Sequence, residues 1–141
     1  MNTEKKRILV VDDEPSITRM LKLNLEQTGE YQVTTENVSR EAVAAAERFL
    51  PDLMLLDVMM PGLDGGNLAS QLQSHPQLKT VPIVFLTAAV THEEIKQRHG
   101  MVGGLPFLAK PVNLKEVLAC LRHHLGAAPV RSAGSQSAQG L

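Results

Sequence analysis

Three carboxylates, one hydroxyl and one ammonium each follow a short apolar run in this sequence. They belong to Asp12, Asp13, Asp57, Thr87 and Lys110. Short apolar runs rich in branched aliphatic residues, separated by helical patterns, predict buried parallel strands. The carboxyl ends of such strands lie along one edge of the sheet, where ligands bind. We therefore expect these five side chains, which are far apart in the sequence, to converge on one crevice.

This set of side chains suits phosphoryl transfer assisted by a divalent cation. Carboxylates that lie close together raise one another's pKa values unless a positive charge offsets them. Mg²⁺ takes oxygen ligands, keeps several waters and pairs with phosphate oxygens. Asp57 is then the candidate nucleophile, since a carboxylate can attack phosphorus to give an aspartyl-phosphate. Lys110 and the cation would offset charge on the transferring group, and Thr87 would offer a hydroxyl to one of its oxygens.

Between these runs the sequence predicts helices with one apolar face each, so that strand and helix alternate five times. The apolar stripes comprise Ile17, Leu21 and Leu25; Val38, Ala42, Ala46 and Phe49; Leu68 and Leu72; and Leu114, Val117, Leu118, Leu121 and Leu125. The first helix should start at Pro15 and end at Gly29, with a short strand over Tyr31–Thr35 after it. Strands alternating with helices in this way favour an α/β fold with a parallel sheet.

Two segments have little capacity to form a core. Thr91 to His99 contains one apolar residue, Ile95, so a helix there is either weakly held and easily displaced or simply a solvated surface helix. From Gly126 the sequence turns to Ala, Gly, Ser, Gln and Pro without periodicity, which predicts a disordered tail or linker over 126–141.

The bulk composition is that of one globular domain. The chain has 141 residues, of which 43% are hydrophobic and 21% charged. A formal net charge of -1 argues against a basic nucleic-acid-binding surface, and no apolar stretch is long enough to span a membrane. The single cysteine, Cys120, excludes an intrachain disulfide and fits a cytoplasmic location.

The motifs LVVDDEP, LMLLDVMMPGLDG, FLTA and FLAKP stand in this order, each at the end of a predicted strand. Together they resemble the receiver domain of bacterial two-component response regulators, in particular single-domain regulators similar to those of chemotaxis. The resemblance covers residues 5–125. It implies a flavodoxin-like, doubly wound (βα)5 fold with a five-stranded parallel sheet in the order 2-1-3-4-5.

The resemblance also implies specific roles for residues of the crevice. Asp12, Asp13, Asp57 and the backbone carbonyl of Met59 would bind Mg²⁺, with Asp12 acting partly through water. Asp57 would accept the phosphoryl group with the help of Thr87 and Lys110. Two further positions follow from the same resemblance: Phe107 would be the aromatic residue that responds together with Thr87, and Pro111 would follow a cis peptide bond. An ordinary core role for Phe107 remains an alternative.

Partners are implied in the same way. A sensor histidine kinase or a phosphotransfer protein would supply the phosphoryl group. A downstream protein or a second copy of the chain would bind the face formed by residues 91–125. The protein would catalyse only its own phosphorylation and dephosphorylation, and we expect no contact with nucleic acid or membrane.

Three other interpretations stay open. The chain could be a receiver-fold interaction module that does not use phosphate, or a receiver fragment of a longer multidomain regulator. A hydrolase of the haloacid-dehalogenase type also uses an aspartyl nucleophile at a strand end, but it usually carries a second Asp two residues later, where Met59 stands here.

Overall fold

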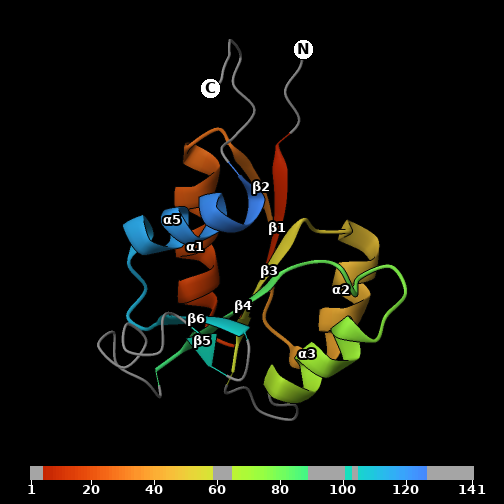
Figure 1. The fold of residues 1–141 in the computed structure, drawn as a ribbon. Coiled ribbons are helices and arrows are strands. Elements are labelled where there is room, and N and C mark those ends of the chain that lie inside the picture. The colour runs from red at the N-terminus through yellow and green to blue at the C-terminus, as the bar shows by residue number, and fades with distance from the viewer. Residues whose placement is uncertain (1–4, 59–64, 89–100, 103–104, 127–141) are drawn as a thin grey trace.

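A five-stranded parallel sheet forms the centre of the molecule (Figure 1). The computed structural model describes residues 5–58, 65–88, 101–102 and 105–126. The parallel strands are β1 (Lys6–Val11), β2 (Tyr31–Glu36), β3 (Leu53–Asp57), β4 (Ile83–Thr87) and β6 (Leu105–Ala109). Their order, β2-β1-β3-β4-β6, confirms the predicted order 2-1-3-4-5. A two-residue strand, β5 (Met101–Val102), pairs antiparallel with β6 and was not predicted.

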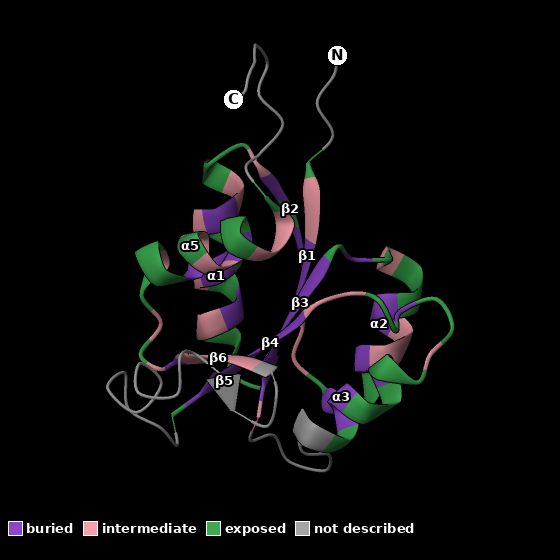
Figure 2. Cartoon of the chain, viewed as in Figure 1, coloured by how far each residue is buried: buried purple, intermediate pink, exposed green. Residues whose placement is uncertain are grey.

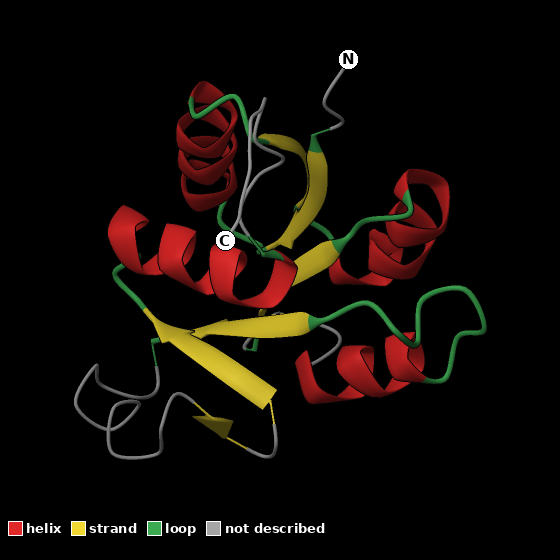
Figure 3. Ribbon diagram, turned by 45° about the horizontal axis from the view of Figure 1, so that its top comes forward, coloured by secondary structure: helices red, strands yellow, loops and turns green. Residues whose placement is uncertain are grey.

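Helices cover both faces of this sheet (Figures 1 and 3). Helices α1 (Pro15–Gln27) and α5 (Leu114–Leu125) pack on one face, and α2 (Ala42–Phe49) and α3 (Gly65–Gln73) pack on the other. None of the helices in the described ranges has the length and apolar character needed to cross a bilayer. The predicted segment Thr91–His99 and the predicted tail beyond Gly126 lie outside the described residues.

The strands are apolar throughout because both of their faces are buried. Successive residues of β1 alternate between two core clusters: Leu9 and Val11 face α2 and α3, whereas Ile8 and Val10 face α1 and α5. All five residues of β3 are buried. Figure 2 shows the same pattern, with buried residues along the central strands and exposed residues on the outer faces of the helices. Two packed layers therefore hold the strand ends, and the polar residues on them, in fixed positions.

Helix α1 starts at Pro15, as predicted, and ends at Gln27, two residues before the predicted Gly29. Pro15 occupies its first turn, and Gly29 follows it with a φ of +79°, a conformation that glycine adopts without steric cost. The prediction for α2 was wrong at its start. Val38 is 43% exposed and precedes a 3₁₀ turn, η1 (Ser39–Glu41), so the α-helix begins only at Ala42. Val38 continues the apolar spacing of α2 in sequence but is extended in conformation.

Side chains of α1 cover the outer edge of β2. The backbone groups of successive strand residues point alternately to the two sides of the strand. The carbonyls of Glu30 and Glu36 accept hydrogen bonds from residues on the β1 side, so even-numbered residues of this segment face β1. Val33 is odd-numbered, and its backbone N–H and carbonyl therefore point away from the sheet. Glu26 Oε2 accepts from the Val33 N–H at 3.0 Å, and Lys22 Nζ donates to the Val33 carbonyl at 2.6 Å. An uncovered edge strand invites pairing with another chain. Lys22 and Glu26 thus occupy the centre of the edge that another strand would need.

The Glu26 contact should make stability depend on pH. Its hydrogen bond with the Val33 N–H lowers the pKa of the Glu26 carboxyl, with Lys22 adding to the effect. A lowered pKa in the folded state means that the carboxylate stabilises the fold above the pKa of the unfolded chain. This contribution is lost as the pH falls through the folded-state pKa. Because the group is largely solvated, we expect it to be worth only about 0.5 kcal/mol.

Urea unfolding of wild type and Glu26→Gln across the acidic range measures this contribution. Glutamine keeps an acceptor for Val33 but has no charge to lose. The wild type should be the more stable protein near neutral pH, and the difference should disappear in acid. A difference that is the same at every pH would contradict the assignment.

Candidate functional site

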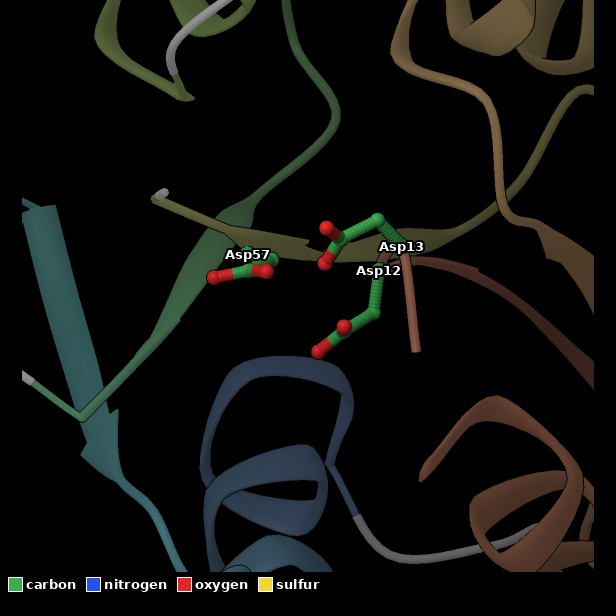
Figure 4. Close-up of side chains that lie close together, drawn as sticks. All are labelled: Asp12, Asp13 and Asp57. Carbon is green, nitrogen blue, oxygen red and sulfur yellow. The ribbon is translucent and has the colours of Figure 1, made fainter. Parts of the chain in front are cut away.

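Four polar side chains from the carboxyl ends of three strands converge in the structure. Asp12 and Asp13 directly follow β1, Asp57 ends the neighbouring strand β3, and Lys110 directly follows β6. Figure 4 shows the three carboxylates directed toward a common space at this edge of the sheet. Residues 45 positions apart in the sequence thus become neighbours, because β1 and β3 are paired and parallel.

The three carboxylates form one acidic cluster. One oxygen from each of Asp12, Asp13 and Asp57 lies within 4.8 Å of the other two. Asp12 is fully buried and Asp57 is 3% exposed, whereas Asp13 is exposed to solvent. The cluster is therefore enclosed by protein on one side and reachable from solvent on the side of Asp13.

Asp12 is held through its backbone and its side chain. Its N–H donates to the Glu36 carbonyl at 3.1 Å, which extends the pairing of β1 with β2 by one residue. Its Oδ1 accepts from the Glu14 N–H at 2.9 Å. Its own carbonyl accepts from Asn37 Nδ2 at 2.7 Å. These contacts leave Oδ2 as the atom of Asp12 that faces the cluster and Lys110.

Lys110 supplies the positive charge of the site. Its Nζ lies 2.8 Å from Asp12 Oδ2, 3.3 Å from Glu14 Oε1 and 3.5 Å from Asp57 Oδ2. Burial by itself would lower the pKa of the Lys110 ammonium. The carboxylates of Asp12, Asp57 and Glu14 outweigh burial, and the net pKa is raised. Lys110 is therefore a charged lysine that three carboxylates share.

The donor set fits a hard divalent cation. Asp12 Oδ2 is buried and receives no hydrogen bond of suitable geometry from the described residues, although the Lys110 ammonium is nearby. Mg²⁺ holds its ligands at about 2.1 Å, so opposite ligands lie about 4.2 Å apart. A separation of up to 4.8 Å is slightly wide for three direct ligands. It suits a cation that binds some of these carboxylates directly and another through water. Met59, the remaining predicted ligand, lies outside the described residues.

Thr87, Phe107 and Pro111 lie on or shortly after β4 and β6. Thr87 ends β4, is 1% exposed and accepts a hydrogen bond from the Lys110 N–H through its carbonyl at 2.8 Å. Phe107 is half-buried, and its ring packs on Phe85 with centroids 5.0 Å apart. Both roles considered for Phe107 stay compatible with this packing. The Lys110–Pro111 peptide bond is cis.

Two further residues, Glu14 and Asn37, contact the site, and neither was predicted from the sequence. Glu14 forms an ion pair with Lys110, and Asn37 holds the Asp12 carbonyl. Glu14 had a weak signal in the sequence, because it extends the acidic pair. Asn37 had none, because only the pairing of β2 with β1 brings it next to Asp12.

Comparison with known proteins agrees with this geometry. The family model described as response regulator receiver domain matches residues 8–122. The alkaline phosphatase synthesis transcriptional regulatory protein PhoP of Bacillus subtilis is 39% identical over 132 residues, which are 93% of this chain and 53% of that protein. The response regulator PleD of Caulobacter vibrioides is 41% identical over 109 residues, which are 76% of this chain and 23% of that protein. The chain thus spans about half the length, or less, of these curated relatives.

Solved structures show the same fold. The chemotaxis protein CheY4 of Vibrio cholerae superposes with a TM-score of 0.73 at 34% identity, covering 86% of this chain and all of that one. The receiver domain of the sensor histidine kinase PA1611 of Pseudomonas aeruginosa superposes with a TM-score of 0.72 at 29% identity, covering 88% of this chain and 100% of that one. That structure has a magnesium ion coordinated in its active-site cleft.

Proposed function

This chain belongs to the response regulator receiver domain family, and we propose that it signals by accepting a phosphoryl group on Asp57. The donor is a sensor histidine kinase or a phosphotransfer protein, as in a two-component pathway of the cytoplasm. The receiver domain comprises residues 5–125, and residues 126–141 form a tail or linker. The chemistry that we propose for this domain is the gain and loss of its own phosphoryl group.

One observation carries this proposal. The Asp57 carboxylate, almost fully buried at the end of β3, lies in a cluster with two other carboxylates and 3.5 Å from the Lys110 ammonium. A carboxylate needed only as a turn or cap residue has no use for two further acidic groups beside it. Their mutual repulsion is a cost that a bound cation and a transferred phosphoryl group would remove.

In the proposed reaction a carboxylate oxygen of Asp57 attacks phosphorus. The new O–P bond forms as the bond between phosphorus and the donor breaks, and the leaving group keeps the electron pair of that bond. Lys110, already charged and directed at Asp57, pairs with an oxygen of the transferring group, and the Thr87 hydroxyl donates to another. Asp12, Asp13, Asp57 and the Met59 carbonyl would hold Mg²⁺, which when bound offsets the negative charge that collects on the phosphoryl oxygens.

The output is a change of surface on the side of β6 and α5. The phosphoryl group draws on Thr87 and Lys110, which end or follow β4 and β6. Phe107 lies on β6 two residues before Ala109, the register partner of Thr87, so a shift of Thr87 affects the space available to the Phe107 ring. A ligand changes such an equilibrium only by binding the two states differently. The face formed by residues 91–125 would bind a downstream protein or a second copy of the chain.

Metal removal tests the proposal directly. The wild-type chain incubated with acetyl phosphate and Mg²⁺ should gain one phosphoryl group, detected by intact-mass spectrometry. The same incubation with EDTA should leave the mass unchanged. If the chain binds Mg²⁺ but takes up neither a phosphoryl group nor a beryllofluoride mimic, an interaction module that does not use phosphate becomes the better interpretation. Steady turnover of a generic phosphate ester would instead favour a hydrolase.

A further inference from the structure

The side chain of Asn37 links the acidic cluster to the strand and helix beside it. Asn37 directly follows β2 and is half-buried. Its Nδ2 donates to the Asp12 carbonyl at 2.7 Å and to Thr18 Oγ1 at 3.0 Å. A carbonyl can only accept, so the amide nitrogen, and not the oxygen, must face Asp12. Both hydrogens of the amide are therefore committed to these two partners.

The first of these bonds controls the peptide that joins the two acidic residues. The Asp12 carbonyl belongs to the peptide plane between Asp12 and Asp13, so fixing its direction fixes the start of Asp13. No described residue donates a hydrogen bond to the Asp13 carboxylate, which is exposed. The position of Asp13 thus depends on its backbone, and Asn37 supplies the side-chain contact that holds the peptide preceding it.

The second bond anchors Asn37 itself. Thr18 is 2% exposed, and its hydroxyl donates to the Pro15 carbonyl at 3.2 Å, which leaves the hydroxyl oxygen to accept from Asn37. The first turn of α1 therefore fixes the Asn37 amide in place. Asp12, Asn37 and Thr18 form one connected set that reaches from the strand end to the buried side of the helix.

We propose that Asn37 is a positioning residue for the divalent cation, which acts by fixing the Asp12–Asp13 peptide so that both carboxylates face Asp57. This inference rests on the proposed function for the identity of the cation. Residues that orient ligands without touching the metal typically account for 10-fold to 100-fold in its affinity. Asn37 holds the backbone between two ligands rather than a ligand side chain, so its loss should weaken binding by about tenfold.

Titration calorimetry with Mg²⁺ alone, without any phosphoryl donor, tests the role. Asn37→Ala should raise the Kd for Mg²⁺ about tenfold, and Asn37→Leu, which removes the amide but keeps its bulk, should do the same. Asn24→Ala is the matched control, because Asn24 also donates from Nδ2 to a backbone carbonyl, that of Met20, at 2.9 Å. That bond lies within α1 and does not involve the acidic cluster, so the control should keep wild-type affinity for Mg²⁺.

Thermal unfolding with and without Mg²⁺ separates positioning from general destabilisation. A ligand that binds only the folded state stabilises it by RT ln(1 + [L]/Kd), so a higher Kd gives less stabilisation at the same ligand concentration. The rise in Tm caused by Mg²⁺ should therefore be smaller in the Asn37 variants and unchanged in Asn24→Ala. Wild-type affinity in both Asn37 variants, or equal losses in Asn24→Ala, would overturn the role. Wild-type protein that binds Mg²⁺ but accepts no phosphoryl group would overturn the proposed function and leave the Asn37 comparison valid.

Discussion

Replacing Asp57 with asparagine is expected to abolish phosphorylation. The amide of asparagine has nearly the shape of the carboxylate but is not a nucleophile at neutral pH, so no aspartyl-phosphate can form. Wild type treated with acetyl phosphate and Mg²⁺ should gain one phosphoryl group, and Asp57→Asn should remain at background. Intact-mass spectrometry after a time course measures both. The effect should be complete rather than partial because Asp12 and Asp13 would be committed to the cation in the proposed site.

Asp57→Asn should nevertheless be a well-folded protein. Removing one of three clustered carboxylates relieves repulsion, so the free energy of unfolding without metal should stay the same or rise by about 1 kcal/mol. Asp52→Asn is a matched control at the other end of β3, where Asp52 accepts from the Arg7 N–H at 2.8 Å. It should be phosphorylated like wild type. Equal labelling of Asp57→Asn and wild type would show that another residue is the acceptor.

The strand ends could be predicted from the sequence because one physical pattern dictates them. A strand buried on both faces must be apolar along its length, so the first polar residue after it marks the place where the chain leaves the core. Asp12, Asp57, Thr87 and Lys110 all occupy such positions. The order of the strands could not be read from apolar patterns alone, because these do not say which strands pair. It followed from the resemblance of the motifs to a known family.

Local conformation and contacts between distant segments were the parts that could not be predicted. Val38 has the spacing of a helical residue, but the chain is extended there and the helix begins later. The two-residue strand β5 is too short to show any period. Asn37 reaches Asp12 across 25 positions of sequence, and a lone asparagine after a strand more often indicates a turn. The contact depends on the pairing of β1 with β2, which no local sequence pattern encodes.

Removal of the Lys110 charge should separate metal binding from phosphoryl transfer. In Lys110→Met the side chain stays unbranched and is one atom shorter, while Asp12, Asp57 and Glu14 lose the ammonium that lies 2.8 to 3.5 Å from each of them. Without metal, the uncompensated carboxylates should lower the free energy of unfolding by about 3 kcal/mol. Mg²⁺ should still bind, at least as tightly as to wild type, because it now supplies the missing positive charge.

The rate of phosphorylation of Lys110→Met should fall, although its affinity for Mg²⁺ does not. Lys110 is the side-chain cation directed at Asp57, and losing a fixed charge or donor at a transferring group commonly costs about a hundredfold in rate. We therefore expect Lys110→Met to accept phosphate from acetyl phosphate about a hundredfold more slowly at saturating Mg²⁺. Lys79 is exposed and precedes β4, so it lies toward the amino ends of the parallel strands, away from the acidic cluster. Lys79→Met should therefore match wild type in both assays. If Lys110→Met lost Mg²⁺ affinity in parallel with its rate, Lys110 would be acting on the shape of the cation site. Its proposed pairing with the phosphoryl oxygens would then be wrong.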